Sequence, residues 1–115
     1  MSEGKAARIR IDDLPSGEDA SRFEGREQGT GISFFVSRHR PGRGPGLHRH
    51  PYEEVFIMEA GEAEFTVGDE TLTAAEGEIV VVPAGTPHKF VCTGDAPLRQ
   101  LSIHPVPRME TEWLE

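Results

Sequence analysis

Short runs of strand-forming residues, separated by turn residues, are the feature that most restricts the fold of this chain. The runs follow one another at residues 7–11, 31–38, 54–59, 63–67, 70–73, 78–82, 88–93 and 98–103. Glycine, proline and aspartate stand between them, as tight turns require, for example at Gly44-Pro45-Gly46 and Gly68-Asp69. No segment of helical length repeats its apolar residues with a helical period. The sequence therefore predicts an all-β protein, an antiparallel sandwich or small β-barrel.

Two of these runs are apolar at consecutive positions rather than at alternate ones. They are Val55–Met58 and Ile79–Val82, whereas a strand with one wet face would alternate apolar and polar residues. Both faces of these strands must then be covered. One face looks into the barrel, and we expect a second copy of the chain to cover the other, which makes the protein a homodimer.

Length, charge and cysteine content limit the class of protein. A chain of 115 residues fits one domain. Its formal net charge of -8 argues against nucleic acid and against an anionic membrane surface as partners. The single Cys92 cannot form an intramolecular disulfide, residues 1–5 lack the apolar run of a signal peptide, and no apolar stretch could span a bilayer. We therefore expect a soluble, cytoplasmic protein with a small-molecule ligand.

Four residues of metal-ligand type combine into the main functional signal. His48 and His50 lie two residues apart, so on a strand their side chains share one face, and Glu54 has the same parity. Glu53 has the opposite parity and is expected to point outward. His88 must come from another strand. A donor set of mostly imidazole nitrogen suits Fe, Mn, Ni, Cu or Zn better than Mg or Ca.

The residues that follow these ligands at the same parity are expected to line the pocket beside the metal. They are Phe56, Met58, Phe90 and Cys92. Cys92 is either a substrate-contacting thiol or a small buried filler, and the filler is the commoner role. His39 and His104 have no ligand-type partners nearby in the sequence and are interpreted as non-ligands. Apart from its ligands, the predicted cavity then has no clear acid–base residue.

These residues fit two motifs that resemble those of the cupin superfamily, in its small single-domain form. The first motif, Gly-x5-His-x-His-x3-Glu-x6-Gly, matches from Gly42 to Gly61, and the second, Gly-x5-Pro-x-Gly-x2-His, matches from Gly77 to His88. Where the family most often has Asn at the end of the second motif, this chain has Cys92. The resemblance implies a small jelly-roll β-barrel, commonly homodimeric, with one divalent transition metal per subunit held by His48, His50, Glu54 and His88.

The resemblance also gives an expected layout of the chain. Residues 1–30 form an N-terminal strand and an irregular segment, residues 31–104 form the cupin barrel, and residues 105–115 form a tail that packs on the barrel or on a partner, in a single domain overall.

The fold supports many reactions, so function has to be inferred from the site. The first hypothesis is a metalloenzyme that acts on a small organic acid or carbonyl compound. Because the predicted cavity lacks an acid–base residue, dioxygenase-like chemistry is favoured over isomerase, lyase or decarboxylase chemistry. The alternative is a non-catalytic binding or sensing module in which the metal anchors a ligand or supports the fold.

Overall fold

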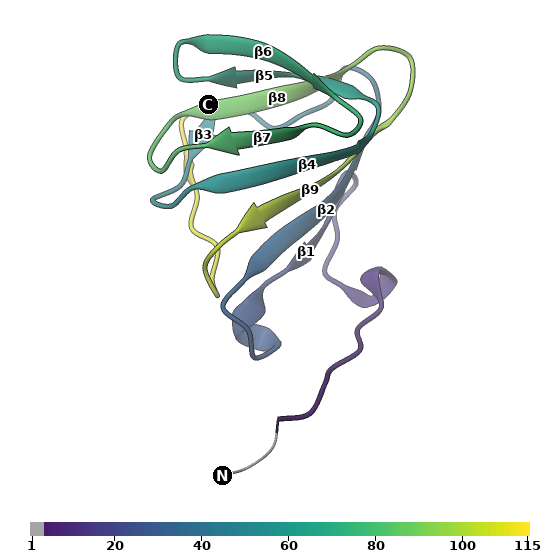
Figure 1. Ribbon diagram of the computed structural model, residues 1–115, viewed down its shortest axis with the longest axis vertical. Helices are drawn as coiled ribbons and strands as arrows, with labels where there is room; N and C mark the ends of the chain where they lie inside the picture. The colour runs from purple at the N-terminus through teal and green to yellow at the C-terminus, as the bar shows by residue number, and fades with distance from the viewer. Residues whose placement is uncertain (1–3) are drawn as a thin grey trace.

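The computed structural model describes residues 4–115, which form two antiparallel five-stranded sheets that face each other as a barrel (Figure 1). The first sheet has the strand order β1-β2-β9-β4-β7 and the second the order β10-β3-β8-β5-β6. The strands are β1 (Ala20–Phe23), β2 (Ser33–His39), β3 (His48–Arg49), β4 (Glu54–Ala60), β5 (Glu62–Val67), β6 (Glu70–Ala75), β7 (Ile79–Val82), β8 (His88–Thr93), β9 (Leu98–His104) and β10 (Glu112–Trp113). The predicted all-β antiparallel fold is confirmed.

The barrel interior is built from alternate residues of the long strands. Along β4, β8 and β9 every second side chain is buried, which is the period of two that a strand imposes. The aromatic rings of Phe56, Phe65 and Phe90 meet at centroid distances of 5.0–5.7 Å. Each such buried side chain stabilises the fold by roughly 1.5–3 kcal/mol through the hydrophobic effect. The apolar core thus fixes the strands on which the polar residues at the other end of the barrel stand.

The two continuously apolar runs are buried on their inner sides, while their outer residues are half-buried on β4 and exposed on β7. Val80 and Val82 of β7 are buried, whereas Ile79 and Val81 on the same strand are 64% and 61% exposed. β7 is also the last strand of its sheet. A single chain therefore leaves the outer face of these strands uncovered.

The N-terminal strand lies elsewhere than the sequence indicated. Residues 7–11 form no strand, and a 3₁₀ turn, η1, occupies Ile11–Asp13. The strand next to β2 is instead β1, inside the stretch expected to be irregular, where Phe23 stacks on Phe34 at a centroid distance of 4.5 Å. The place beside β2 is therefore taken by β1 and not by residues 7–11. A second 3₁₀ turn, η2, spans Gly25–Glu27, and residues 1–3 lie outside the described part of the chain.

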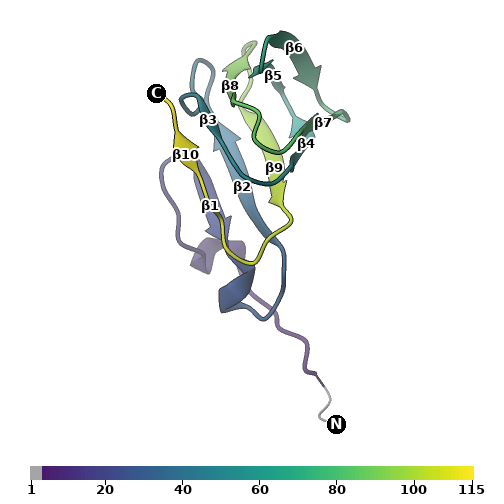
Figure 2. The ribbon, with the colours of Figure 1, turned by 90° about the vertical axis from the view of Figure 1, so that its left-hand side faces the viewer.

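The tail after β9 returns along the barrel wall. Figure 2 shows it in yellow, turning back at the end of β9 and running up to β10. There Trp113 pairs with His48 and Glu112 pairs with Arg49, so the tail adds an edge strand to the second sheet. Among residues 4–115, neither 3₁₀ turn is long and apolar enough to cross a membrane.

The loop before β3 is held tightly against β8. Gly42 N donates to Cys92 O at 2.9 Å, and Cys92 N donates to Arg43 O at 2.8 Å. One residue further, a Cβ atom on Gly44 would collide with the backbone carbonyl of Phe90. A Cβ on Gly46 would instead lie at ordinary contact distance, 3.4 Å or more, from atoms of Glu115. This close approach delivers His48 to the barrel mouth.

We therefore expect Gly44→Ala to destabilise the protein by about 1–3 kcal/mol, because the added methyl group forces β8 and the loop apart. Gly46→Ala in the same loop is the matched control, and it should change the free energy of unfolding far less. Denaturant unfolding followed by circular dichroism measures both. Equal stabilities for the two variants would contradict the proposed contact.

Candidate metal centre

Four side chains of ligand type meet at the mouth of the barrel. His48 and His50 come from β3 and the residue after it, Glu54 opens β4, and His88 opens β8, where it pairs directly with His48 across the strands. One donor atom from each residue lies within 4.8 Å of the others, and all four residues are buried. Glu53, next to the carboxylate, is exposed, as its parity predicts. The structure thus brings together the set of residues that the sequence singled out.

The backbone fixes the orientation of three imidazoles in the same way. The Nδ1 atoms of His48, His50 and His88 lie 2.8, 2.7 and 2.8 Å from the carbonyl oxygens of Gly46, Glu110 and Thr86. A carbonyl oxygen can only accept, so each Nδ1 has to carry the proton. In the neutral ring the lone pair then lies on Nε2, which faces the centre of the cluster.

Glu54 lies at the centre of this cluster. Its Oε1 atom is 2.9 Å from His88 Nε2 and 3.0 Å from His50 Nε2. Burial alone would raise the pKa of Glu54, but contacts with His104, His50 and His88 outweigh burial and hold the pKa well below its ordinary value. The carboxylate is therefore charged, although its side chain is only 4% exposed.

The pKa values of His48, in β3, and of His50, directly after it, shift in opposite directions. Burial lowers the pKa of His48, and the neighbouring His88 and His50 add to this effect. Burial also disfavours charged His50, but its contacts with Glu54 and the Glu110 carbonyl raise its pKa overall. His48 is therefore neutral near pH 7, the form in which imidazole binds a metal ion.

The chemistry of this donor set fits a transition metal ion. His50 and His88 each donate their Nδ1 proton to a backbone carbonyl. In a neutral ring the Nε2 atom then carries only a lone pair, which would repel the Glu54 carboxylate that it faces. The arrangement therefore requires either a positively charged ring or a cation between the ring and the carboxylate. His50 Nε2 has no aligned hydrogen-bond partner although it is buried. Three imidazole nitrogens and one carboxylate oxygen are ligands for Fe, Mn, Ni, Cu or Zn.

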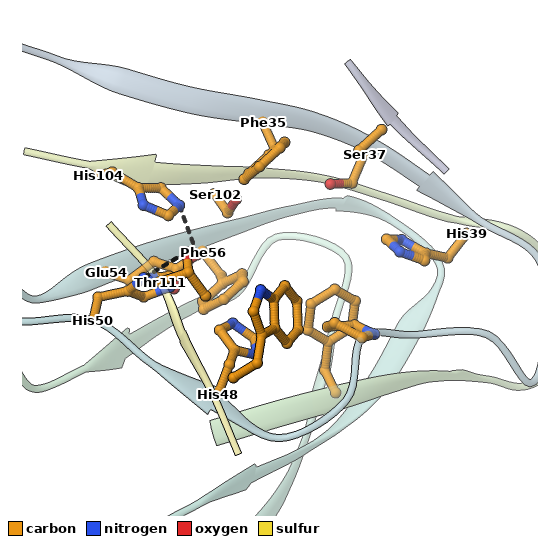
Figure 3. Close-up of a pocket in the computed structure, with 14 residues that line it drawn as sticks. Phe35, Ser37, His39, His48, His50, Glu54, Phe56, Ser102, His104 and Thr111 are labelled. Atoms are coloured by element: carbon orange, nitrogen blue, oxygen red, sulfur yellow. Dashed lines mark hydrogen bonds and ion pairs between the residues drawn. The ribbon is translucent and has the colours of Figure 1, made fainter. Parts of the chain in front are cut away.

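A fourth imidazole, from His104 at the end of β9, also reaches Glu54. Its Nε2 atom lies 3.1 Å from Glu54 Oε2, and its Nδ1 atom lies 2.6 Å from the hydroxyl of Tyr52. Figure 3 shows His104 above Glu54 and His50, with a dashed line to the carboxylate. Sequence reasoning missed both His104 and Tyr52 as parts of the site. The alternation of Leu98, Gln100, Ser102 and His104 on one face of β9 was the available signal.

A small cavity of about 160 Å³ opens beside the cluster. His39 lies at the end away from the cluster, and Phe35, Ser37 and Ser102 lie along one wall between them (Figure 3). Among the residues expected to line it, Phe56 and Phe90 do so. Met58 and Cys92 lie two residues further along β4 and β8 and are buried in the apolar core instead. Because His39 and His104 both border the cavity, it does contain acid–base groups, contrary to the sequence-based expectation.

Comparison with known proteins gives matches of two kinds. An uncharacterized protein of Streptomyces coelicolor is 49% identical over 41 residues, which are 36% of this chain and 39% of that protein. An oxalate decarboxylase of Bacillus subtilis, solved in work on its Mn(II) centres, matches with a TM-score of 0.81 at 22% identity, over 99% of this chain and 35% of that one. The matched regions thus cover less than half the length of both proteins.

A third match has the size of this chain. An uncharacterized conserved protein with a double-stranded β-helix domain from Klebsiella pneumoniae has a TM-score of 0.76 at 20% identity, over 96% of this chain and 99% of that one. At such identities the two structural matches show the fold alone. The Cupin domain family, in contrast, matches the sequence itself over residues 35–104, from β2 to the end of β9. The chain is therefore a member of the cupin family.

Proposed function

We propose that this cupin binds one divalent transition metal ion through His48, His50, Glu54 and His88 and acts as a metalloenzyme on a small organic acid or carbonyl compound. The observation that carries the proposal is the convergence of four buried donor atoms, within 4.8 Å of one another, beside a small cavity. Four protein ligands leave up to two positions of an octahedral ion for a substrate. A bound ion supplies Lewis-acid chemistry and, where it is redox-active, electron transfer.

The cavity supports a substrate of small size and mixed polarity. Its volume of about 160 Å³ is below the roughly 300–1,000 Å³ of pockets for drug-sized ligands. Phe35 and Phe56 offer apolar walls, while the hydroxyl groups of Ser37 and Ser102 can donate to carbonyl or carboxylate oxygens. Burial lowers the pKa of His39, so its ring meets a ligand in the neutral form. A short carboxylic acid or dicarbonyl compound matches these features.

The reaction is metal-centred, and two classes fit the cavity. The sequence favours dioxygenase-like chemistry because it predicts no acid–base group in the cavity. The structure weakens that reason, because His39 and His104 border the cavity. The fold shared with oxalate decarboxylase, an enzyme named for a small dicarboxylic acid, supports a substrate of the same class here. Assays that detect both oxygen uptake and carbon dioxide release therefore test the proposal fully.

Metal binding is tested with His50→Ala. We expect this variant to lose most of its metal because one of four ligands is gone, while the barrel stays folded because the apolar core does not depend on the ion. Elemental analysis of protein purified without added metal measures the content. His39→Ala is the matched control, since it removes another buried imidazole of the cavity but keeps the donor set. An unchanged metal content in His50→Ala would contradict the ligand assignment.

Catalysis is tested by loading the protein with iron, manganese, nickel, copper or zinc and supplying short dicarboxylic acids, dicarbonyl compounds, catechols and thiols. We expect turnover, seen as oxygen consumption or carbon dioxide release, with at least one metal. His50→Ala should abolish it. Ligand-induced shifts in melting temperature without turnover under any metal would contradict the enzymatic proposal and support the binding module.

We further propose that the protein is a homodimer through the outer face of the first sheet. Strand register aligns two rows of apolar side chains across β2, β9, β4 and β7. One row is Phe34, Ile103, Val55 and Val81, and the other is Val36, Leu101, Ile57 and Ile79. A face so rich in apolar side chains, ending at the exposed Ile79 and Val81, favours association with a like surface.

The dimer is tested with Val81→Lys, which places a charge in the apolar face. We expect sedimentation at micromolar concentration to give a dimer for the unchanged protein and a monomer for the variant, since a buried, unpaired charge is costly. Thr71→Lys on the exposed side of β6 is the control and should remain dimeric. A monomeric mass for the unchanged protein would overturn the proposal.

A further inference from the structure

His104 differs from the other three imidazoles around Glu54 in the partner of its Nδ1 atom. The Nδ1 atoms of His48, His50 and His88 each face a backbone carbonyl, which can only accept. The Thr111 hydroxyl also lies 3.3 Å from His50 Nδ1, but the Glu110 carbonyl is nearer, at 2.7 Å, and requires the proton on that nitrogen. His104 Nδ1 faces the Tyr52 hydroxyl at 2.6 Å, and a hydroxyl can donate as well as accept. The proton of His104 is therefore not forced onto Nδ1.

The surroundings of Tyr52 determine which way its hydroxyl points. The backbone N–H of Glu110 donates to Tyr52 Oη at 3.2 Å. Tyr52 is buried, and because the ordinary pKa of a tyrosine hydroxyl is about 10, it keeps its proton near neutral pH. If His104 also donated to the hydroxyl, the buried tyrosine proton would have no acceptor, a loss of roughly 1–3 kcal/mol. The tyrosine proton therefore goes to His104 Nδ1, and His104 carries its own proton on Nε2.

This tautomer places a neutral N–H beside the carboxylate of Glu54. His104 Nε2 lies 3.1 Å from Oε2, close enough for attraction, although the ring is not aligned for a regular hydrogen bond. The other oxygen, Oε1, faces His50 and His88. The two carboxylate oxygens thus have different neighbours, and those of Oε1 are the proposed metal ligands.

We propose that His104, oriented by Tyr52, is a positioning residue that holds Glu54 Oε2 and so presents Oε1 alone to the metal ion. This inference rests on the proposed metal site. It also distinguishes His104 from a fifth ligand. The four donor atoms lie within 4.8 Å of one another, and His104 is not a member of that set. Its Nε2 proton excludes it from coordination as long as Tyr52 donates to Nδ1.

The first experiment needs no metal. Long-range proton–nitrogen NMR of the metal-free protein, at a pH above the ordinary imidazole pKa of about 6.5, reports which nitrogen of each histidine is protonated. We expect the proton on Nε2 of His104, whose signals are assigned by their loss in His104→Gln. Tyr52→Phe should shift His104 toward the Nδ1 tautomer. A proton on Nδ1 in the unchanged protein would overturn the inference.

The second experiment measures Zn²⁺ affinity by competition with a chelator. His104→Leu removes the N–H and should weaken binding about 10–100-fold, as losses of residues that orient ligands do. His104→Gln, whose amide can donate to Oε2, should restore most of the affinity. His39→Leu is the control, because it also removes a buried imidazole but one that packs on Phe90, at a centroid distance of 5.1 Å, and is not a member of the donor set. Its affinity for Zn²⁺ should stay unchanged. If His104→Leu bound Zn²⁺ as tightly as the unchanged protein does, this result would contradict the proposed role.

X-ray absorption of the zinc-loaded proteins separates positioning from ligation. We expect the same number of imidazole ligands in the unchanged protein, His104→Gln and His104→Leu, with an additional carboxylate oxygen in His104→Leu because Oε2 is released. One imidazole fewer in both variants would make His104 a ligand and overturn the proposal. If the unchanged protein takes up no Zn²⁺, the metal site itself fails, and the NMR experiment still decides the Tyr52–His104 arrangement.

Discussion

A buried negative charge governs the arrangement of this barrel mouth. The side chain of Glu54 is 4% exposed, and an ionised carboxylate in such surroundings is tolerated only with compensating partners. Imidazoles from β8, from β9 and from the segment after β3 supply them. Those rings are held in turn by a carbonyl of one loop, by a carbonyl of the tail and by a tyrosine hydroxyl. Strands, loops and tail thus converge on one carboxylate.

The parts of the site that could be predicted from the sequence are those that local geometry determines. Side-chain parity on a strand is fixed within a few residues, so His48, His50 and Glu54 share a face wherever the strand lies. Turn glycines and the apolar runs likewise mark most strands. The placement of His88 beside His48 required only that the two strands pair, which the cupin motifs imply.

The parts that could not be predicted depend on contacts between distant segments. His104 meets Tyr52 across 52 positions of the chain, and the Glu110 carbonyl meets His50 across 60. Neither distance leaves a local pattern. The strand expected at residues 7–11 fails for a related reason, since an alternating pattern becomes a strand only if the fold places it beside another strand, and here β1 takes the place beside β2. The short run Ala20–Phe23 of β1 has no comparable pattern of alternation.

The tail has a consequence for how the protein is made. Glu110 supplies the carbonyl that orients His50 and the N–H that orients Tyr52, and Trp113 packs beside His48 at a centroid distance of 4.9 Å. All barrel strands from β1 to β9 are translated before these residues. The apolar core consists of residues before the tail, whereas His50 and Tyr52 depend on Glu110 for their partners. The orientation of His50 toward the cluster is therefore completed only when residues 110–113 dock on the barrel.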